Sequence, residues 1–361
     1  MNASPESFPL PTTGPPPTEA PVPRPRWRVL LTSYEYWPFY VFFAPLVPYF
    51  AYLALRARSL TFFTAVNPGI PLGGLFGESK SAILDGVPPA YLPRTQLFPA
   101  GTPPAPVRDW MARQGLTFPL VLKPDVGERG EGVHVVETAD GLARAVRVLG
   151  RDPFLAQEWV PGPLEFGVFY YRLPDGSASG VTSVVQKEFL RVCGDGRSTI
   201  RQLLAPNERA RMAGSELAEV LEDLGHRVPA PGEWVLVQPV GNHCRGTKFL
   251  NANHLLGPAL DGVFDRIAAP MAGFYYGRFD LRVPSVADLL AGQNIRVLEV
   301  NGVTSEPGHV YDPTYSLPRA YADIARHLKL QYRISRQHRA AGVPVAPFSE
   351  VWACLRERFG G

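Results

Sequence analysis

Three oxygen-bearing side chains late in the sequence have the types and spacing of a magnesium site. Glu299 and Asn301 stand two residues apart in RVLEVNG, so on a strand both side chains face the same side. Asp280, in the preceding strand GRFDLRV, supplies a third oxygen ligand from across the ladder. Magnesium commonly binds one or two carboxylates together with the phosphates of ATP. The alternative, a solvated strand face, fits poorly because Arg278 stands beside Asp280.

A lysine and a glycine-rich loop indicate where phosphate groups would bind. In VLKPDVGERGEGVHVV a strand ends in Lys123, and glycine lets backbone N–H groups close around phosphate oxygens. The glycines are Gly127, Gly130 and Gly132. The loop is not a Walker A motif, because it lacks GK[ST] and leads into a strand, and an ordinary glycine-rich hairpin is the alternative. Glu128 and Glu131 place negative charge there, which Arg129 would have to offset.

A third segment, FLAQEWVPGPLEFGVFYY, suits an adenine ring. It reads as an edge strand followed by a Pro-Gly turn, and the alternative is an ordinary hairpin. Adenine needs one backbone donor, one backbone acceptor and an apolar wall. Glu165, just beyond the turn, is positioned for a ribose hydroxyl. The four residues that could bind adenine are Gln157, Glu158, Trp159 and Val160.

In this order and over this distance, these motifs resemble the ATP-grasp superfamily across roughly residues 107–332. GRFD and LEVNG look like strands of D-alanine–D-alanine ligases, and VCGDGRSTIRQLL resembles a segment of cyanophycin synthetase and of glutathione-forming ATP-grasp ligases. The resemblance implies an α+β fold whose two lobes enclose ATP, with a short N-terminal lobe that carries an apolar segment. It does not single out one substrate.

The resemblance also implies how the nucleotide would bind. Lys123 matches a lysine that contacts the α-phosphate and adenine, and residues 127–132 match the loop that covers the β- and γ-phosphates. Residues 157–160 match the adenine hinge, and Glu165 matches the ribose-binding acid. The three oxygen ligands match those of Mg²⁺, for which Mn²⁺ can substitute.

Further residues take catalytic and substrate roles by the same resemblance. Lys80, in GESKSAIL, looks like an earlier lysine that binds ATP. Lys187 lies on the strand leading to the GDG turn and faces the γ-phosphate, and Arg278 stabilises the tetrahedral intermediate. Three residues of GNHCRGTKFL stand where related ligases place substrate contacts: His243, Arg245 and Lys248.

The composition limits the other classes. The chain has 361 residues, of which 45% are hydrophobic, and this suits a folded protein of two or three domains. A net charge of +3 is far from the imbalance typical of nucleic-acid binders, so we expect no nucleic-acid partner. The three cysteines are widely spaced, which disfavours disulfides and zinc sites and indicates a reducing compartment.

The chain divides into five predicted regions. Residues 1–26 form a disordered proline-rich head, because so few large apolar side chains cannot offset the entropy of ordering. Residues 27–60 hold an apolar segment, and residues 61–106 precede the ATP-grasp domain without a clear parallel substrate domain. The ATP-grasp domain covers residues 107–335, with a mobile lobe at about 118–190. Residues 336–361 form a helical tail.

The apolar segment allows three interpretations. Residues 37–55 include no charge, and arginines flank them on both sides. Nineteen residues just reach the length that crosses a bilayer, so the segment either spans the membrane, lies in its interface or re-enters it, or is buried in the N-terminal lobe. Pro38, Pro45 and Pro48 favour a short broken helix in the interface. We therefore expect a cytoplasmic protein associated with the inner face of the membrane.

These features predict a magnesium- and ATP-dependent ligase that joins a carboxylate to an amine or thiol. The reaction would pass through an acylphosphate and release ADP and phosphate. Partners would be small-molecule, peptide or lipid-linked carboxylates and amines. The alternatives are an ATP-grasp phosphotransferase acting on a hydroxyl, and a membrane-associated ATP-binding module with little turnover. The sequence is compatible with a dimer but determines no oligomeric state.

Overall fold

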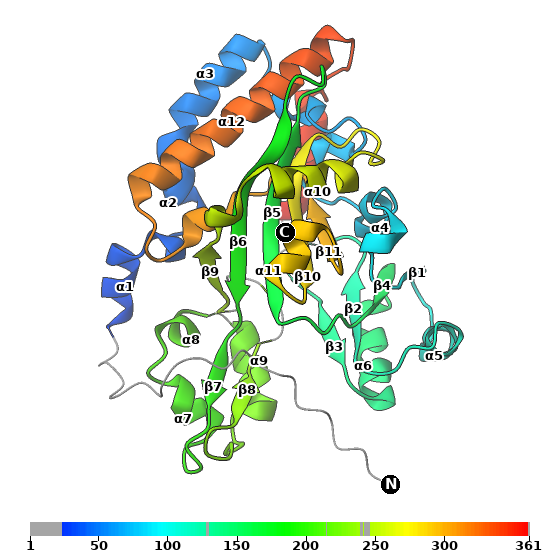
Figure 1. Cartoon of the computed structure of the whole chain (residues 1–361), viewed down its shortest axis with the longest axis vertical. Coiled ribbons are helices and arrows are strands. Elements are labelled where there is room, and N and C mark those ends of the chain that lie inside the picture. The colour runs from blue at the N-terminus through cyan, green and yellow to red at the C-terminus, as the bar shows by residue number, and fades with distance from the viewer. Residues whose placement is uncertain (1–23, 128–129, 214, 239–240, 242–245, 360–361) are drawn as a thin grey trace.

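The computed structural model describes residues 24–127, 130–213, 215–238, 241 and 246–359. Its largest sheet has five antiparallel strands in the order β11–β10–β5–β6–β9, with α10 (Pro258–Ala268) and α11 (Val286–Ala291) on one face (Figure 1). Strands β5 and β6 form a hairpin, which turns through Gly176 at a positive φ of 72°. The strand bounds are Leu164–Arg172 (β5), Ser179–Glu188 (β6), Lys248–Asn251 (β9), Tyr276–Val283 (β10) and Arg296–Asn301 (β11).

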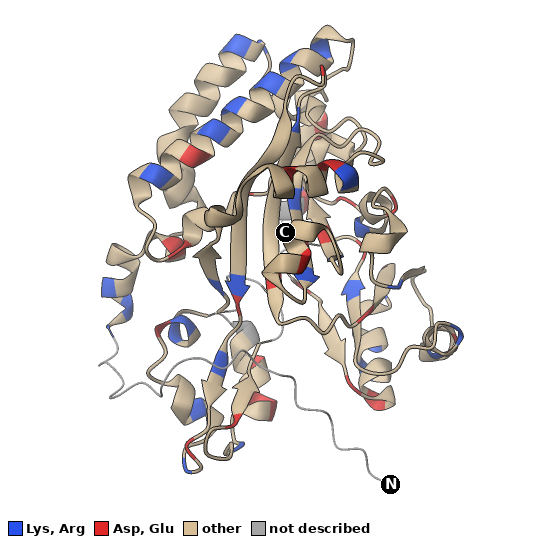
Figure 2. Cartoon of the chain, viewed as in Figure 1, with Lys and Arg blue, Asp and Glu red and all other residues tan. Residues whose placement is uncertain are grey.

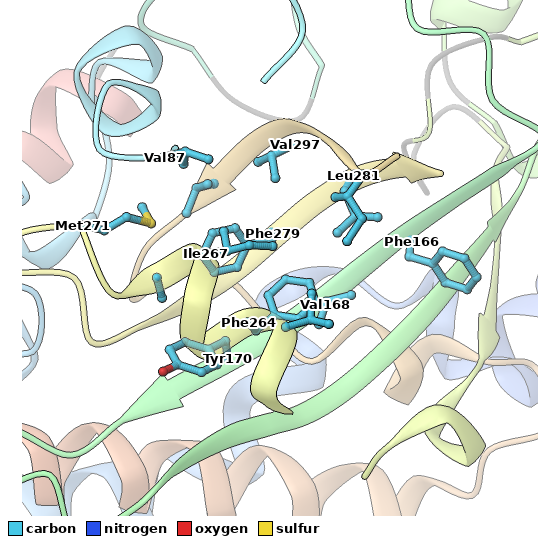
Figure 3. Packing of buried hydrophobic residues seen from close by; sticks show 14 of the residues in the cluster. Val87, Phe166, Val168, Tyr170, Phe264, Ile267, Met271, Phe279, Leu281 and Val297 are labelled. Atoms are coloured by element: carbon cyan, nitrogen blue, oxygen red, sulfur yellow. The ribbon is translucent and has the colours of Figure 1, made fainter. Parts of the chain in front are cut away.

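The two faces of this sheet differ in character because side chains alternate along each strand. On β10, Phe279, Leu281 and Val283 enter the main hydrophobic core. Figure 3 shows Phe279 and Leu281 packed with side chains of β5 and α10 in that core. The residues that alternate with them on β10 are Arg278, Asp280 and Arg282, and they therefore face the other way. A shift of the strand pairing by one residue would put their charges into the core.

A smaller lobe is built on a four-stranded antiparallel sheet in the order β1–β4–β2–β3. Its helices pack on this sheet around a separate hydrophobic core. The lobe starts before the predicted residue 118 and ends at β4, because β5 and β6 belong to the large sheet. Its elements are β1 (Thr95–Phe98), α5 (Pro104–Arg113), β2 (Leu120–Pro124), β3 (His134–Val136), α6 (Ala139–Leu149) and β4 (Phe154–Glu158).

The GDG segment belongs to a third, small module. Asp195 accepts hydrogen bonds from the backbone N–H groups of Arg197 (2.8 Å) and Ser198 (2.6 Å), which closes the turn after β7. Thr199 and Gln202 then form a capping box that starts α7. In this chain the motif thus has a clear structural role. The module comprises β7 (Arg191–Cys193), α7 (Ile200–Leu204), α8 (Glu208–Met212), α9 (Ser215–Leu224) and β8 (Trp234–Leu236).

The apolar segment forms two short helices, α2 (Phe39–Phe43) and α3 (Val47–Ala57), after α1 (Arg26–Thr32). Each proline stands at the start of a helical turn, where its missing N–H is not needed. This explains how three prolines fit into a mainly helical run. Part of the segment is buried: Phe42 packs against Val310 and Ile324, and Leu53 packs against Phe62.

Helix α12 (Leu317–Ala340) lies beside α3 and carries the predicted C-terminal helical region (Figure 1). It runs through residue 335, where we predicted a boundary, so the tail does not begin a new element there. A last helix, α13 (Phe348–Phe359), follows, and the short helix α4 (Lys80–Leu84) stands earlier in the chain, before the small lobe.

Candidate functional site

A cavity of about 780 Å³ brings the predicted site residues together. It is lined by both lobes: β2 and β4 of the small lobe on one side, and the charged face of the large sheet on the other. The predicted fold class, two α+β lobes around a central cavity, is confirmed. Among the described residues predicted to bind nucleotide or metal or to act in catalysis, only Gly132 does not line it, and Arg129 lies outside the described residues. The lining residues are Lys80, Lys123, Gly127, Gly130, Gln157, Glu158, Trp159, Val160, Glu165, Lys187, Arg278, Asp280, Glu299 and Asn301.

A buried network of charges covers the large-sheet side. Lys187 Nζ lies 3.0 Å from Glu165 Oε1 and 3.4 Å from Asp280 Oδ1. Arg278 binds Asp280 through two hydrogen bonds of 3.1 Å. Arg282 donates to Glu165 Oε2 at 2.9 Å, so both oxygens of Glu165 have cationic partners. A ribose hydroxyl would have to share this carboxylate with Lys187 and Arg282.

Opposite charges in this network shift the pKa values of Asp280, Lys187 and Glu165 in the direction that keeps each of them charged. Burial alone would raise the pKa of Asp280, but Arg278 and Lys187 outweigh burial and lower it. Burial would lower the pKa of Lys187, but Asp280 and Glu165 outweigh it and raise this pKa. Glu165 behaves like Asp280: burial would raise its pKa, but Lys187 and Arg282 outweigh burial and lower it. The site therefore presents fixed charges at neutral pH.

The three predicted metal ligands do lie together. Asp280 on β10 pairs directly with Glu299 on β11, and Arg278 pairs with Asn301. The register then shifts, so that Leu281 pairs with Val297 and Leu298 is the extra residue of a β-bulge. Asn301 Nδ2 lies 3.4 Å from Asp280 Oδ2.

Lys123 crosses from the small lobe to this bulge. Its Nζ donates to the carbonyl of Leu298 at 2.9 Å and to Gln157 Oε1 at 3.2 Å. Burial and the nearby Lys80 lower the pKa of Lys123 to about 8, although Glu299 and Asp125 act in the opposite direction. Lys123 is therefore a buried cation with carbonyl partners, which would gain from an arriving anion.

The glycine loop is tied to the start of α4. Lys80 Nζ contacts the carbonyl of Gly127, and Asp125 accepts from Ser79 Oγ at 2.7 Å and from the backbone N–H of Ser81 at 2.8 Å. Gly127 and Gly130 adopt φ values of 151° and 74°, which favour glycine. Glu128 lies outside the described residues. The described part brings Lys80 and Lys123 to the same wall of the cavity.

The hinge after β4 shows unsatisfied polar groups. Arg282 Nη1 donates to the carbonyl of Val160 at 2.9 Å, and its guanidinium lies 4.6 Å from the centre of a Trp159 ring. Trp159 Nε1 is buried, and among the described residues it has no hydrogen-bond partner. The backbone N–H of Val160 likewise donates to no described group. The Glu158 carboxylate instead binds Arg94, with an N–O distance of 2.7 Å.

Several contributing residues were not predicted. Gly167 stands opposite Asp280 on β5, and a Cβ there would lie 3.0 Å from Asp280 Oδ1, so only glycine leaves room. Arg282 is two residues from Asp280, and strand alternation could have identified it. Glu78 lines the cavity, and burial, with a contribution from Glu299, raises its pKa. Glu306 also lines the cavity, but its sequence context contains no recognisable signal.

The predicted substrate contacts are not brought to this cavity by what the structure describes. Lys248 begins β9, where it pairs with Glu188, and it is not one of the lining residues. His243 and Arg245 lie outside the described residues.

The residues fit a hard cation in type and orientation. Glu299 is the carboxylate of the set that has no hydrogen-bond or ionic partner in the described part of the chain, whereas Asp280 is shared with Arg278 and Lys187. No group of three or more His, Cys, Asp or Glu side chains that could hold a metal occurs within the described ranges. The set therefore fits an ion that takes its remaining ligands from phosphate oxygens, as magnesium commonly does.

Comparison with solved structures matches the chain to several ligases and synthetases at low identity and low TM-score. A bifunctional glutathione synthetase from Pasteurella multocida is 16% identical over 68% of this chain and 35% of its own (TM-score 0.35). The VanG D-Ala:D-Ser ligase from Enterococcus faecalis is 14% identical over 71% and 61% (TM-score 0.40). A D-alanine–D-alanine ligase from Bacillus anthracis, complexed with ATP, is 16% identical over 73% and 66% (TM-score 0.38).

This chain matches only about a third of the length of the glutathione synthetase and about three fifths of VanG. No family model matches the chain, and no curated protein matches it. At these identities and TM-scores, the likeness adds nothing about substrate or reaction, for which the cavity provides the evidence.

Proposed function

We propose that this protein is an ATP-dependent carboxylate–amine ligase that works through an acylphosphate. The observation that carries the proposal is the composition of one cavity. Lys80 and Lys123 line it near the glycine loop, and the Asp280, Glu299 and Asn301 set lines it beside Arg278. Cations for phosphate oxygens, ligands for a metal and a cation for a carboxylate thus line one cavity.

The cavity offers each part of ATP a place. Adenine would lie at the hinge, where the N–H of Val160 can donate and Val121, Val133 and Val135 provide apolar wall. The phosphates would lie between the two lysines and Glu299. When bound through Asp280, Glu299 and Asn301, magnesium would neutralise phosphoryl charge. Lys123 would then exchange its carbonyl partners for phosphate oxygens.

Arg278 is placed to act on the acid. A carboxylate oxygen of the acid attacks the γ-phosphorus, the bond to the bridging oxygen breaks, and ADP leaves. The amine nitrogen then attacks the carbonyl carbon of the acylphosphate, phosphate leaves, and the amine loses a proton. In both steps negative charge develops near the Arg278 guanidinium, which Asp280 holds in position. Closure of the small lobe would exclude the water that otherwise hydrolyses the acylphosphate.

Hydroxylamine trapping tests this proposal. The full chain is incubated with Mg-ATP, hydroxylamine and pooled carboxylic acids, and we expect a hydroxamate together with equal amounts of ADP and phosphate. Glu299→Gln serves as the inactive control. A phosphorylated product that forms from a single hydroxyl co-substrate would favour the phosphotransferase instead. Absence of ATP binding by the full chain would refute both.

We also propose that the protein lies on an anionic membrane surface through its apolar segment. Residues Phe39–Ala57 are long and apolar enough to cross a bilayer by length and composition, and 22% of their most apolar 18-residue stretch is buried. Tyr40 and Leu55 are 75% and 78% exposed. A second cavity, of about 540 Å³, lies where α3 and α12 end and is lined by three arginines: Arg56, Arg336 and Arg339. Lys and Arg also recur along α12 (Figure 2).

Such an arrangement suits phospholipid headgroups, because arginine binds phosphate and the neighbouring apolar side chains can enter the interface. Flotation of the full chain with vesicles tests this. More protein should float with vesicles that contain phosphatidylglycerol than with vesicles of phosphatidylcholine alone. The floated fraction should fall in the double variant Arg336→Ala/Arg339→Ala but not in the control Arg147→Ala on α6. Equal recovery from both vesicle types would refute the headgroup role. Deleting the segment is unsuitable, because Phe42 and Leu53 are buried.

A further inference from the structure

The cavity of the proposed site extends to the apolar N-terminal segment. The cavity lining includes aromatic side chains of α2 and of the residue that precedes the N-cap of this helix. Helix α2 lies toward the β9 edge of the large sheet, whereas the small lobe, where adenine would bind, lies toward the β11 edge (Figure 1). This aromatic wall consists of Trp37, Phe39, Tyr40, Phe42 and Phe43.

A short series of contacts joins the aromatic wall to the reactive end of the cavity. Arg278 Nη1 lies 3.4 Å from the carbonyl of Glu306, whose carboxylate accepts a hydrogen bond from the Tyr311 hydroxyl. The Tyr311 ring lies 5.6 Å from the Phe42 ring, measured between ring centres. The corresponding distance from Phe42 to Phe43 is 5.2 Å. The guanidinium that would hold a carboxylate is therefore connected to the aromatic wall through Glu306 and Tyr311.

Nucleotide binding does not account for this wall. The hinge, the two lysines and the oxygen ligands already offer sites for adenine, phosphates and metal, and none of them belongs to α2. Core packing does not account for all of it either, because Phe39 is 57% exposed while it lines the cavity. A binding cavity lined by aromatic side chains with a few convergent charged groups is typical of a ligand that is mainly apolar with one polar end.

We propose that the carboxylate substrate is an amphiphilic acid whose carboxyl group binds Arg278 and whose apolar chain lies along the aromatic wall. This inference rests on the proposed function for the role of Arg278. The chain would pass Tyr311 and Phe42 and leave the cavity beside Phe39 and Tyr40, at the exposed face of the apolar segment. An acid of this kind partitions into membranes, so its entry point and the apolar face coincide.

A binding experiment that needs no turnover tests the inference. The full chain, saturated with Mg-ADP, is titrated with 11-(dansylamino)undecanoic acid, and unlabelled straight-chain acids from butyrate to hexadecanoate then displace it below their micelle concentrations. Affinity should rise with chain length by up to about fourfold per methylene, the limit set by full burial of each methylene, and then level off. Equal affinity for butyrate and dodecanoate would overturn the inference.

Two variants of the same segment locate the chain. Phe39→Ser removes part of the aromatic wall at an exposed position and should weaken dodecanoate binding at least about fivefold, with butyrate unchanged. Leu55→Ser removes an apolar side chain on α3 that is also exposed but lies outside the cavity, and it should change the affinity for neither acid. Equal weakening in both variants, or in neither, would overturn the placement. Hydroxamate formation from short acids with no chain-length effect would refute this inference and leave the ligase proposal standing, whereas loss of ATP binding would refute the ligase.

Discussion

Replacing Lys123 by methionine tests the phosphate side of the site, because this lysine is charged and buried before any nucleotide arrives. Its pKa of about 8 lies some 2.5 units below the usual value of about 10.5. At about 1.4 kcal/mol per pKa unit, burial and the nearby Lys80, partly offset by Glu299 and Asp125, cost the ammonium form about 3 kcal/mol relative to the neutral form. A phosphate oxygen would remove this cost, and a charge-assisted hydrogen bond contributes about 1.5–3 kcal/mol. We therefore expect Lys123→Met to weaken ATP binding by about 10- to 150-fold.

The same pKa predicts how binding depends on pH. Above pH 8 the free protein carries neutral Lys123, so ATP binding must take up a proton if the bound form is the ammonium. Affinity should therefore be constant below about pH 7.5 and should fall toward tenfold per pH unit above pH 8. The ATP affinity of Lys123→Met should not fall in this way above pH 8. Lys329 is an exposed lysine on α12, and Lys329→Met should keep the pH dependence of the wild type.

Isothermal titration of Mg-ADP and a non-hydrolysable ATP analogue between pH 7 and 9.5 measures this. Two buffers with different ionisation enthalpies report the proton uptake directly. A wild-type affinity that does not change over this range, with no proton uptake, would show that no phosphate engages Lys123. The same conclusion follows if Lys123→Met binds as tightly as wild type.

Three more substitutions test the rest of the site. Glu299→Gln should lower turnover about 100-fold, a loss of about 3 kcal/mol, without changing the melting temperature, and normal turnover at high Mg²⁺ would refute the ligand role. Arg278→Ala should lower turnover by about 100-fold while ATP affinity stays within about threefold, so a loss of affinity alone would contradict its role with the acid. Gly167→Ala puts a Cβ 3.0 Å from Asp280 Oδ1 and should lower both turnover and stability, the latter by about 1–3 kcal/mol on chemical denaturation. Gly262→Ala, whose Cβ meets nothing closer than 3.7 Å, is the matched control and should lower neither turnover nor stability.

Much of the site could be predicted from the sequence because its residues lie on strands. Strand alternation put Glu299 and Asn301 on one face, and the structure places both beside Asp280 in the cavity. The glycines and Lys123 likewise follow one another over a few residues, so their proximity needs no knowledge of the fold. Alternation also separates Arg278 and Asp280 from the core residues between and beyond them.

Other features depend on contacts between segments that are distant in the sequence. The small lobe includes β1 and excludes β5, because hydrogen bonding across strands, and not adjacency in the chain, decides sheet membership. Lys123 donates to the carbonyl of Leu298, which lies 175 residues further along the chain, and the requirement for Gly167 arises from its neighbours on β6 and β10.

The apolar segment shows most clearly which properties follow from the sequence and which depend on the tertiary structure. Its length, its lack of charge and its flanking arginines are properties of the sequence alone, and they indicate an affinity for an apolar environment. Hydropathy cannot tell whether that environment is lipid, protein or ligand, since all three are apolar. Only the tertiary structure decides the fate of each side chain: Phe42 and Leu53 are buried in the protein, Phe39 and Tyr40 line the cavity, and Leu55 is exposed. The reason is that partners such as Val310 and Ile324, which bury Phe42, come from distant parts of the chain.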